Sequence, residues 1–168
     1  PESFLSEQEY LTGERIATIK HEYINGRVYA QAGASRNHNV LVSNTIIALG
    51  NLLKKRSCTV FPSDLRVAIP KKRTYVYPDI TVVCGHERFT DLHNDTLLNP
   101  TIIIEVLSPS TEAYDRGAKF ERYRHIASLQ EYILIAQNRI HIEQFVRQAD
   151  NQWTLTLYNH TDEVLVLS

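Results

Sequence analysis

A single carboxylate, Glu105, interrupts the apolar stretch T-I-I-I-E-V-L-S-P-S at residues 101–110. Its neighbours Ile104 and Val106 leave the stretch without a polar face, which is the pattern of a strand covered on both sides. A charge inside such a strand is costly unless it is paired with an opposite charge or coordinates a metal ion. We therefore expect another part of the chain to supply a partner for Glu105.

A second acid, Asp79, stands in an equally unusual place. It follows Pro78 in the β-rich stretch Y-V-Y-P-D-I-T-V-V, although both Pro and Asp are depleted in strands. Taken alone, this pattern indicates an edge strand or a bulge with a local Asp turn. If the strands of Asp79 and Glu105 are neighbours, their carboxylates converge, and one holds a proton or a hard divalent cation lies between them. Mg²⁺ suits such an open pair, because it keeps several waters and leaves room for a phosphate.

Lys119 is the candidate positive group for such a site. It lies in D-R-G-A-K-F-E-R-Y-R, in a predicted helix that follows the Glu105 strand and folds back over the end of the sheet. Asp115 and Tyr123 stand four residues before and after Lys119, so one helical stripe carries all three side chains. The alternative is an exposed ion pair between Asp115 and Lys119, which would contribute little to stability. Tyr123 either lines the site or belongs to the core.

Capping, turn and periodicity signals predict the elements in the N-terminal part of the chain. Ser6 and Glu9 match a capping box, and Ser35 is a possible helix cap. Asn-Gly between two alternating segments predicts a tight hairpin, because both turn positions need positive φ. The expected elements are a helix at 7–12, a hairpin turning at Asn25-Gly26 and a helix at 36–55.

The rest of the chain is predominantly β-rich. Its expected elements are three strand segments between 58 and 83, a polar loop at 85–99, a strand at 101–107, a helix from Ser110 or Thr111 to about 126, and four alternating strands at 131–136, 139–147, 153–158 and 163–167. The last four indicate an antiparallel meander. We predict a single α+β domain over residues 1–168, with a mixed sheet flanked by helices.

Composition excludes some classes of function. The 168 residues are 43% hydrophobic, which suits one compact core, and the net charge is −1. A pI of about 6.8 is not that of a protein that coats nucleic acid by its overall charge. Local basic clusters exist at 54–56, at 71–73 and at Arg116, Arg122 and Arg124, although such runs are usually solvated surface.

Targeting signals and cysteines bear on the location of the protein. No apolar run approaches the roughly 20 residues that span a bilayer, so no membrane partner is expected. The first ten residues lack the basic and apolar regions of a secretory signal. Cys58 and Cys84 are the only cysteines and lack a disulfide-rich or C-x-x-C context. We interpret both as reduced thiols in a cytoplasmic protein. The seven His residues match no zinc spacing.

The pattern P-D, then E in an apolar strand, resembles the PD-(D/E)XK nuclease superfamily. More narrowly, V-Y-P-D-I-T-V-V, N-P-T-I-I-I-E-V-L-S-P-S-T, Y-D-R-G-A-K-F-E-R-Y and E-Y-I-L-I together resemble the Uma2 family, a bacterial group described as restriction endonucleases. The likeness extends from about residue 5 to the final strands. It implies a restriction-endonuclease-like fold and a Mg²⁺- or Mn²⁺-dependent endonuclease that acts on DNA.

The resemblance also assigns roles to residues. Asp79, Glu105 and Lys119 would be catalytic. The superfamily has Lys two residues after the Glu, where this chain has Leu107, so the lysine's role is taken over by Lys119. Glu22 matches the early Glu that often stands beside the metal, which makes Glu22, Asp79 and Glu105 the implied metal ligands. The backbone carbonyl of Val106 is a further implied ligand.

Several alternatives remain open from the sequence. Glu22 is otherwise an exposed strand residue before the hairpin, and Asp64 and His38 are fainter candidates for the site. Loss of the superfamily lysine and the near-neutral net charge favour a second function, a catalytically inactive nuclease fold that binds nucleic acid or protein. A third function is a structural homo-oligomer whose exposed tail strands pair between subunits. We expect a homodimer, which is compatible with each of these functions and suits an enzyme that cuts both strands of a duplex.

Overall fold

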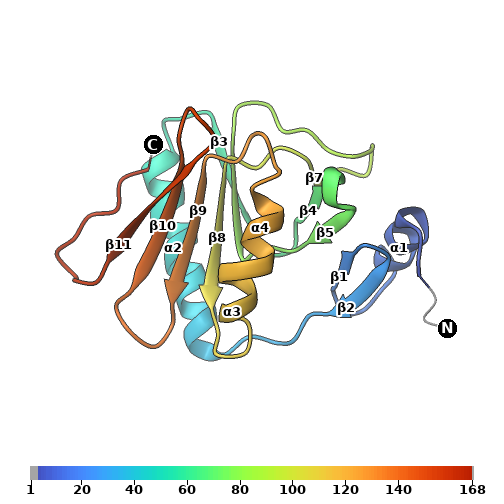
Figure 1. Ribbon diagram of the computed structural model, residues 1–168, viewed down its shortest axis with the longest axis horizontal. Coiled ribbons are helices and arrows are strands. Elements are labelled where there is room, and N and C mark those ends of the chain that lie inside the picture. The colour runs from blue at the N-terminus through green and yellow to red at the C-terminus, as the bar shows by residue number, and fades with distance from the viewer. Residues whose placement is uncertain (1–3, 168) are drawn as a thin grey trace.

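The computed structural model describes residues 4–167 as two β-sheets with helices between and beside them (Figure 1). The smaller sheet has the order β2-β1-β5-β4-β7, formed by Arg27–Ala30, His21–Ile24, Thr74–Val76, Arg66–Ile69 and Thr96–Leu97. The larger sheet has the order β11-β10-β9-β8-β6-β3, formed by Trp153–Tyr158, Ile142–Arg147, Glu131–Ala136, Ile102–Leu107, Ile80–Cys84 and Cys58–Pro62. The predicted α+β class is therefore confirmed, with two mixed sheets in place of one.

Strand β8 lies inside the larger sheet and is apolar because both its faces are covered. It pairs antiparallel with β6 and parallel with β9, and β9, β10 and β11 form the predicted antiparallel meander. Ile102 and Ile104 pack against helix α2 (Arg36–Leu53), whereas Ile103 and Leu107 pack in the core on the opposite face. By strand alternation, Glu105 shares the second face, so the strand delivers its carboxylate between the two sheets.

A helical segment lies between the two sheets, on the face of β8 opposite α2 (Figure 1). It consists of α3 (Glu112–Tyr114), the π-helical turn η2 (Asp115–Lys119) and α4 (Phe120–Tyr123). Tyr123 packs with core residues of both sheets, including Val67 of β4 and Leu134 of β9. The helix predicted to reach residue 126 therefore ends slightly earlier and contains one wide turn.

The N-terminal elements follow their sequence signals. Helix α1 (Glu7–Glu14) starts with the predicted capping box, in which the Ser6 and Glu9 side chains bond to each other's backbone N–H. The hairpin turns at Asn25 and Gly26, with φ of 50° and 91°. A side chain at Gly26 would in addition lie only 2.7 Å from the ring of Phe4. Helix α2 begins after its Ser35 cap, as predicted.

Two strand predictions are wrong. The stretch at 75–83, interpreted as one strand pattern, is divided between β5 in the smaller sheet and β6 in the larger one, because the chain changes sheets at 77–79. Asp79 therefore lies in the connection, immediately before β6. The segment 163–167 is not a strand, although it alternates as expected: Leu165 and Leu167 pack on the α2 side of the core, and Val164 and Val166 are exposed.

The interpretation of the cysteines as free thiols is also wrong. Cys58 of β3 and Cys84 of β6 are direct partners in the antiparallel register and form a disulfide. Their side chains meet because the register places them opposite each other, which the local context of each cysteine does not reveal. The reduced-thiol argument for a cytoplasmic location is thereby removed, and that location stays a prediction. In the described part of the chain, none of the helices has the length and apolar character needed to cross a membrane.

Candidate active site

The carboxylates of Asp79 and Glu105 meet where β6 begins and β8 ends. Ile80 of β6 pairs with Ile104 of β8 in antiparallel register, so Asp79 and Glu105, one residue beyond this pair, are opposite each other. The backbone N–H of Asp79 donates to Oε2 of Glu105 at 3.3 Å, and the backbone N–H of Val106 donates to Oδ2 of Asp79 at 2.8 Å. The predicted convergence of these two side chains is therefore present, and each carboxylate accepts one backbone N–H from the opposite segment.

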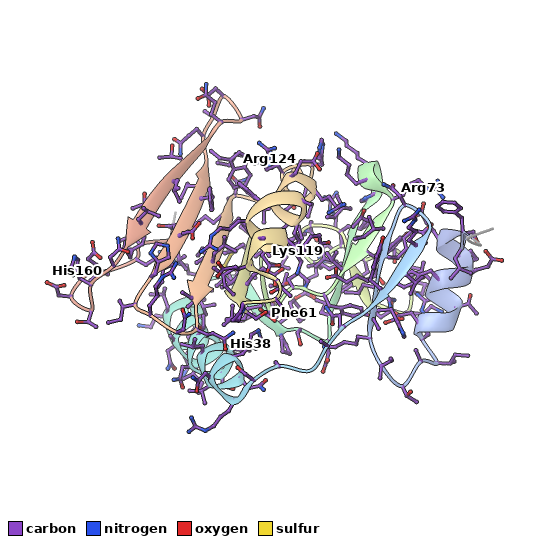
Figure 2. The ribbon with its side chains drawn as sticks, turned by 60° about the horizontal axis from the view of Figure 1, so that its bottom comes forward. His38, Phe61, Arg73, Lys119, Arg124 and His160 are labelled. Carbon is purple, nitrogen blue, oxygen red and sulfur yellow. A yellow bond between two sulfur atoms is a disulfide. The ribbon has the colours of Figure 1, made fainter. Side chains whose placement is uncertain are left out.

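Lys119 completes the pair from the helical segment. Its Nζ lies 2.8 Å from Oε1 of Glu105 and 3.5 Å from Oδ1 of Asp115. The Lys119 residue is 6% exposed, which excludes the alternative of a surface ion pair. The π-helical turn places Asp115 and Lys119 together on the inner side, and Figure 2 shows Lys119 near the middle of the molecule. Single π-helical turns of this kind occur frequently at functional sites.

Glu22 approaches the same ammonium from the smaller sheet. It belongs to β1 and is buried, contrary to the alternative of an exposed strand residue. Its Oε1 lies 3.6 Å from Nζ of Lys119, and the hydroxyl of Tyr114 donates to its Oε2 at 3.5 Å. We call Glu22, Asp79, Glu105, Asp115 and Lys119 the acid-rich cluster; it joins elements from both sheets and the helix between them.

One aromatic and one acidic side chain of the helical segment, Tyr123 and Asp115, help to hold the acid-rich cluster together. Tyr123 is fully buried and donates its hydroxyl proton to Oε1 of Glu105 at 2.8 Å, so it is both a core residue and a carboxylate partner. Asp115 is buried beside Lys119, and its backbone carbonyl accepts a bond from the Tyr132 hydroxyl at 3.0 Å. Sequence reasoning placed Asp115 on the correct stripe but gave it no role in the site. The signal was its four-residue spacing from Lys119.

His38 is a second residue that the sequence assigned only faintly. Its Nε2 lies 3.0 Å from Oδ2 of Asp79, and it reaches this position from the first turn of α2. Asp64, by contrast, does not join the cluster: its side chain is 87% exposed and pairs with Lys20 on the surface.

The electrostatics of the cluster follow from burying more acids than bases. Burial raises the pKa of Glu105 to about 8, and the like charges of Asp79 and Asp115 add to this effect, whereas Lys119 opposes it. Burial alone would lower the pKa of Lys119, but its carboxylate neighbours, Glu105 foremost, raise that pKa well above its ordinary value. The hydrogen bond to Asp79 raises the pKa of His38. Lys119 is thus charged at neutral pH, and the cluster still carries an excess of acid.

The chemistry of the donors fits a hard divalent cation, although no ready-made cage is present. Among residues 4–167, no three His, Cys, Asp or Glu side chains are close enough together to form a metal site by themselves. Asp79 and Glu105 nevertheless supply adjoining carboxylate oxygens, which are the ligands that Mg²⁺ and Mn²⁺ prefer. Burial and the neighbouring acids raise the pKa of Glu105, so its charged form would be stabilised by a cation bound beside it.

Comparison with known proteins gives this geometry a family context. A family model named Uma2 and described as "Putative restriction endonuclease" matches residues 7–168. A Synechocystis protein named "Uncharacterized protein slr1290" is 36% identical over 160 residues, which cover 95% of this chain and 83% of that protein. Another, "Uncharacterized protein sll1609", is 41% identical over 152 residues, covering 90% and 86%.

A solved structure shares the fold. It is described as a "putative nuclease belonging to DUF820" from Anabaena variabilis and matches with a TM-score of 0.76, covering 98% of this chain and 89% of that chain. At 19% sequence identity, this likeness speaks for the fold alone. Together with the family match, it confirms the predicted restriction-endonuclease-like fold class.

Proposed function

The chain belongs to the Uma2 family of restriction-endonuclease-like proteins, and on this premise we propose that it is a metal-dependent endonuclease that hydrolyses DNA phosphodiester bonds. The ion pair between Lys119 and Glu105 carries this proposal. Leu107, at the superfamily's lysine position, is buried in the core, whereas Nζ of Lys119 lies 2.8 Å from the Glu105 carboxylate. The chain therefore keeps an ammonium beside its paired acids despite the substitution.

Each residue of the acid-rich cluster has a role in this reaction. Lys119 would orient the attacking water or stabilise the negative charge that develops on the phosphoryl oxygens. Tyr123 holds Glu105 through its hydroxyl, and the Val106 N–H and His38 hold Asp79. Asp115 and Glu22 keep Lys119 protonated and in place by their proximity to its Nζ. These bonds fix the reacting groups before substrate arrives, which lowers the cost of reorganisation during the reaction.

Asp79 and Glu105 would hold one or two Mg²⁺ or Mn²⁺ ions, with Glu22 assisting. When bound, such an ion supplies Lewis-acid polarisation of the phosphate and a lower pKa for the attacking water. Glu22 is held about Lys119 rather than beside Asp79, so its part in metal binding is the least direct of the three.

Plasmid nicking tests the assignment. We expect the parent protein to nick supercoiled DNA in Mg²⁺ or Mn²⁺, and Asp79→Asn or Glu105→Gln to reduce the rate by orders of magnitude, because each removes a carboxylate charge with little change of shape. Asp64→Asn is the matched control, since Asp64 is a surface acid outside the cluster, and it should cut as the parent does. Equal cutting by all the variants would show that the site is assigned wrongly.

Leu107 in place of the superfamily's lysine and the near-neutral net charge favour a second function, a nuclease fold that binds nucleic acid or protein without cutting. Calorimetric titration with Mn²⁺ separates the two functions. Binding that disappears in Asp79→Asn supports the endonuclease, whereas no binding at millimolar Mn²⁺ supports the binding module. The predicted homodimer is compatible with both, and sedimentation at several protein concentrations tests it.

A further inference from the structure

A pocket of about 440 Å³ lies where the helical segment, the start of β11 and the turn before β5 come together. Residues from three distant parts of the sequence line it: Lys71, then Arg124 and His125, then Arg147, Asn151 and Trp153. The ion pair between Lys72 and Glu121, with 2.9 Å between Nζ and Oε1, joins the η1 turn (Pro70–Lys72) to α4. Basic clusters that are separate in the sequence thus become one surface.

Arg147 forms a fixed part of this surface. Its Nη2 donates to the backbone carbonyls of Arg124 and Ile126, both at 2.9 Å, and its guanidinium lies 4.8 Å from the ring centroid of Trp153. These carbonyls follow the last turn of α4, where helix carbonyls lack intrahelical partners. Arg147 therefore fixes the backbone that carries Arg124 and His125, so the pocket is held in shape before any ligand binds.

The pocket carries positive charge that is not neutralised locally. None of the described residues that line it is acidic. Within residues 4–167, neither Lys71 nor Arg124 has an acidic side chain within ion-pair distance, and both side chains are exposed. Lys72 and His125 instead share Glu121. Two exposed cations without an acidic partner in the lining of one pocket favour an anion with more than one negative group.

We propose that this pocket binds the phosphodiester backbone of the nucleic acid whose cleavage is proposed above, and so positions the strand relative to Lys119. This inference rests on the proposed function for the identity of its ligand. Arg124 immediately follows the helical segment and stands five residues beyond Lys119 (Figure 2), which is a rise of about 8 Å along a helix axis. At about 3.4 Å per nucleotide, this corresponds to roughly two phosphates of one strand.

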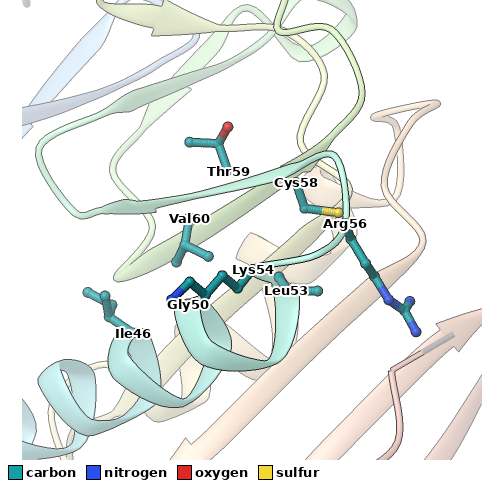
Figure 3. A pocket seen from close by; sticks show the side chains of 8 residues that line it. All are labelled: Ile46, Gly50, Leu53, Lys54, Arg56, Cys58, Thr59 and Val60. Carbon is teal, nitrogen blue, oxygen red and sulfur yellow. The ribbon is translucent and has the colours of Figure 1, made fainter.

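Salt-dependent binding tests the pocket without requiring cleavage. The full chain in EDTA is titrated into a fluorescently labelled DNA duplex, and the dissociation constant is measured by anisotropy at several KCl concentrations. The test variant carries Lys71→Gln and Arg124→Gln, which remove two charges from exposed side chains. The matched control carries Lys54→Gln and Arg56→Gln, which remove two charges from another pocket, of about 340 Å³, between α2 and β3 (Figure 3).

The expected result is weaker binding by the test variant, with a slope of log K against log salt that is smaller by about two, because each lost phosphate contact removes roughly 0.9 from it. The control should keep the parent's affinity and slope. An unchanged slope in the test variant, or an equal loss in the control, would overturn the inference. If the test variant binds DNA as the parent does and the parent nicks DNA, the pocket proposal is wrong and the proposed function stands. If binding depends on the pocket but the parent does not nick DNA, only the proposed endonuclease activity is wrong.

Discussion

Two polar clusters in this molecule bury charged side chains with opposite balances of acidic and basic groups. The first is the acid-rich cluster. The second, which we call the arginine network, joins α1 and β4 to the loop before β7; its members are Glu14, Arg15, His21, Arg66, Tyr77, Asp91 and Asp95. In the network, three carboxylates face two guanidinium groups and one imidazole. In the acid-rich cluster, four carboxylates face one ammonium, with His38 at the edge.

The charge balance decides the direction of the pKa shifts. In the arginine network, Arg15 bonds to Asp95 and Asp91 at 2.7 Å and lowers the pKa of both carboxyls, so each group is held in its charged form. In the acid-rich cluster, burial raises the pKa of Glu105 to about 8 even beside Lys119, so the charged form of this carboxyl is disfavoured by its surroundings. A balanced cluster stabilises the fold by itself, whereas an acid excess gains from an added cation. The contrast separates a structural network from a candidate active site.

Removing the ammonium should produce the largest effect. For Lys119→Met we expect the nicking rate to fall about 10²–10³-fold, the range found when a preorganised electrostatic group is removed. Mn²⁺ affinity, measured by calorimetry, should be kept, because the carboxylates remain and lose a competing positive charge. Lys20→Met is the control, since Lys20 pairs with the exposed Asp64. A Lys119→Met protein that cuts at the parental rate would show that the two clusters do not differ in function.

Breaking the arginine network should instead affect stability. Arg66 is 3% exposed and bonds to the Tyr77 hydroxyl and the Thr96 hydroxyl, both at 2.9 Å, and its Nη2 lies 3.1 Å from Asp95. Arg66→Met leaves these groups buried without their partner, so we expect a loss of about 3 kcal/mol in the free energy of unfolding. Urea denaturation measures it.

The matched control for Arg66 is Arg73→Met. Arg73 forms an exposed pair with Glu7 and should change stability by less than about 0.5 kcal/mol. Mn²⁺ affinity should be the same in Arg66→Met as in the parent, because the arginine network binds no part of the acid-rich cluster. A changed Mn²⁺ affinity with unchanged stability would reverse the roles assigned to the two clusters.

Sequence reasoning found the acid-rich cluster more easily than the arginine network. Asp79 and Glu105 were visible because each violates a strand pattern, and Lys119 because it follows in the next helix. Arg66 gives no such signal. It stands in D-L-R-V-A-I-P, where one charge next to a turn is ordinary. Its burial depends on the position of the loop that carries Asp95 and Thr96, thirty residues away in the chain.

The features that were missed depend on register and on packing between elements. The disulfide requires that Cys58 and Cys84 be opposite each other in β3 and β6. The sequence of either segment alone does not predict the register between the two strands. The tail 163–167 alternates like a strand, but Leu165 and Leu167 pack on α2-side residues without a paired neighbour strand. Local sequence patterns thus predicted most of the elements and the residues of the acid-rich cluster. Which elements pack or pair with each other could be determined only from the structure.

The acid excess predicts an unusual pH dependence in the absence of metal. The folded pKa of Glu105 is raised from 4.5 to about 8, so between these values the folded protein holds a proton that the unfolded chain releases. Stability therefore falls as pH rises through this range. Gln at this position does not titrate, so in EDTA the stability of Glu105→Gln relative to the parent should rise from pH 5 to pH 8, by on the order of 2 kcal/mol. The lost bond to Lys119 lowers the stability of the variant at both pH values and does not affect this trend. Thermal unfolding at both pH values measures the trend; a relative stability that stayed the same or fell towards pH 8 would contradict the raised pKa.

The arginine network predicts the opposite pH dependence and the smallest effect. The hydrogen bond from Arg15 lowers the pKa of Asp95, so its contribution to stability is present above the unfolded pKa and is lost as pH falls through the folded pKa. Asp95→Asn should cost about 1 kcal/mol at pH 7, a modest value because a third of the side chain is exposed to solvent screening. The difference from the parent should shrink as the pH is lowered below 4, and high salt should reduce it at pH 7. Urea denaturation across this pH range measures both effects. A difference that grew on acidification would mean that the pKa of Asp95 is raised like that of Glu105, and the distinction between the balanced and the acid-rich cluster would fail.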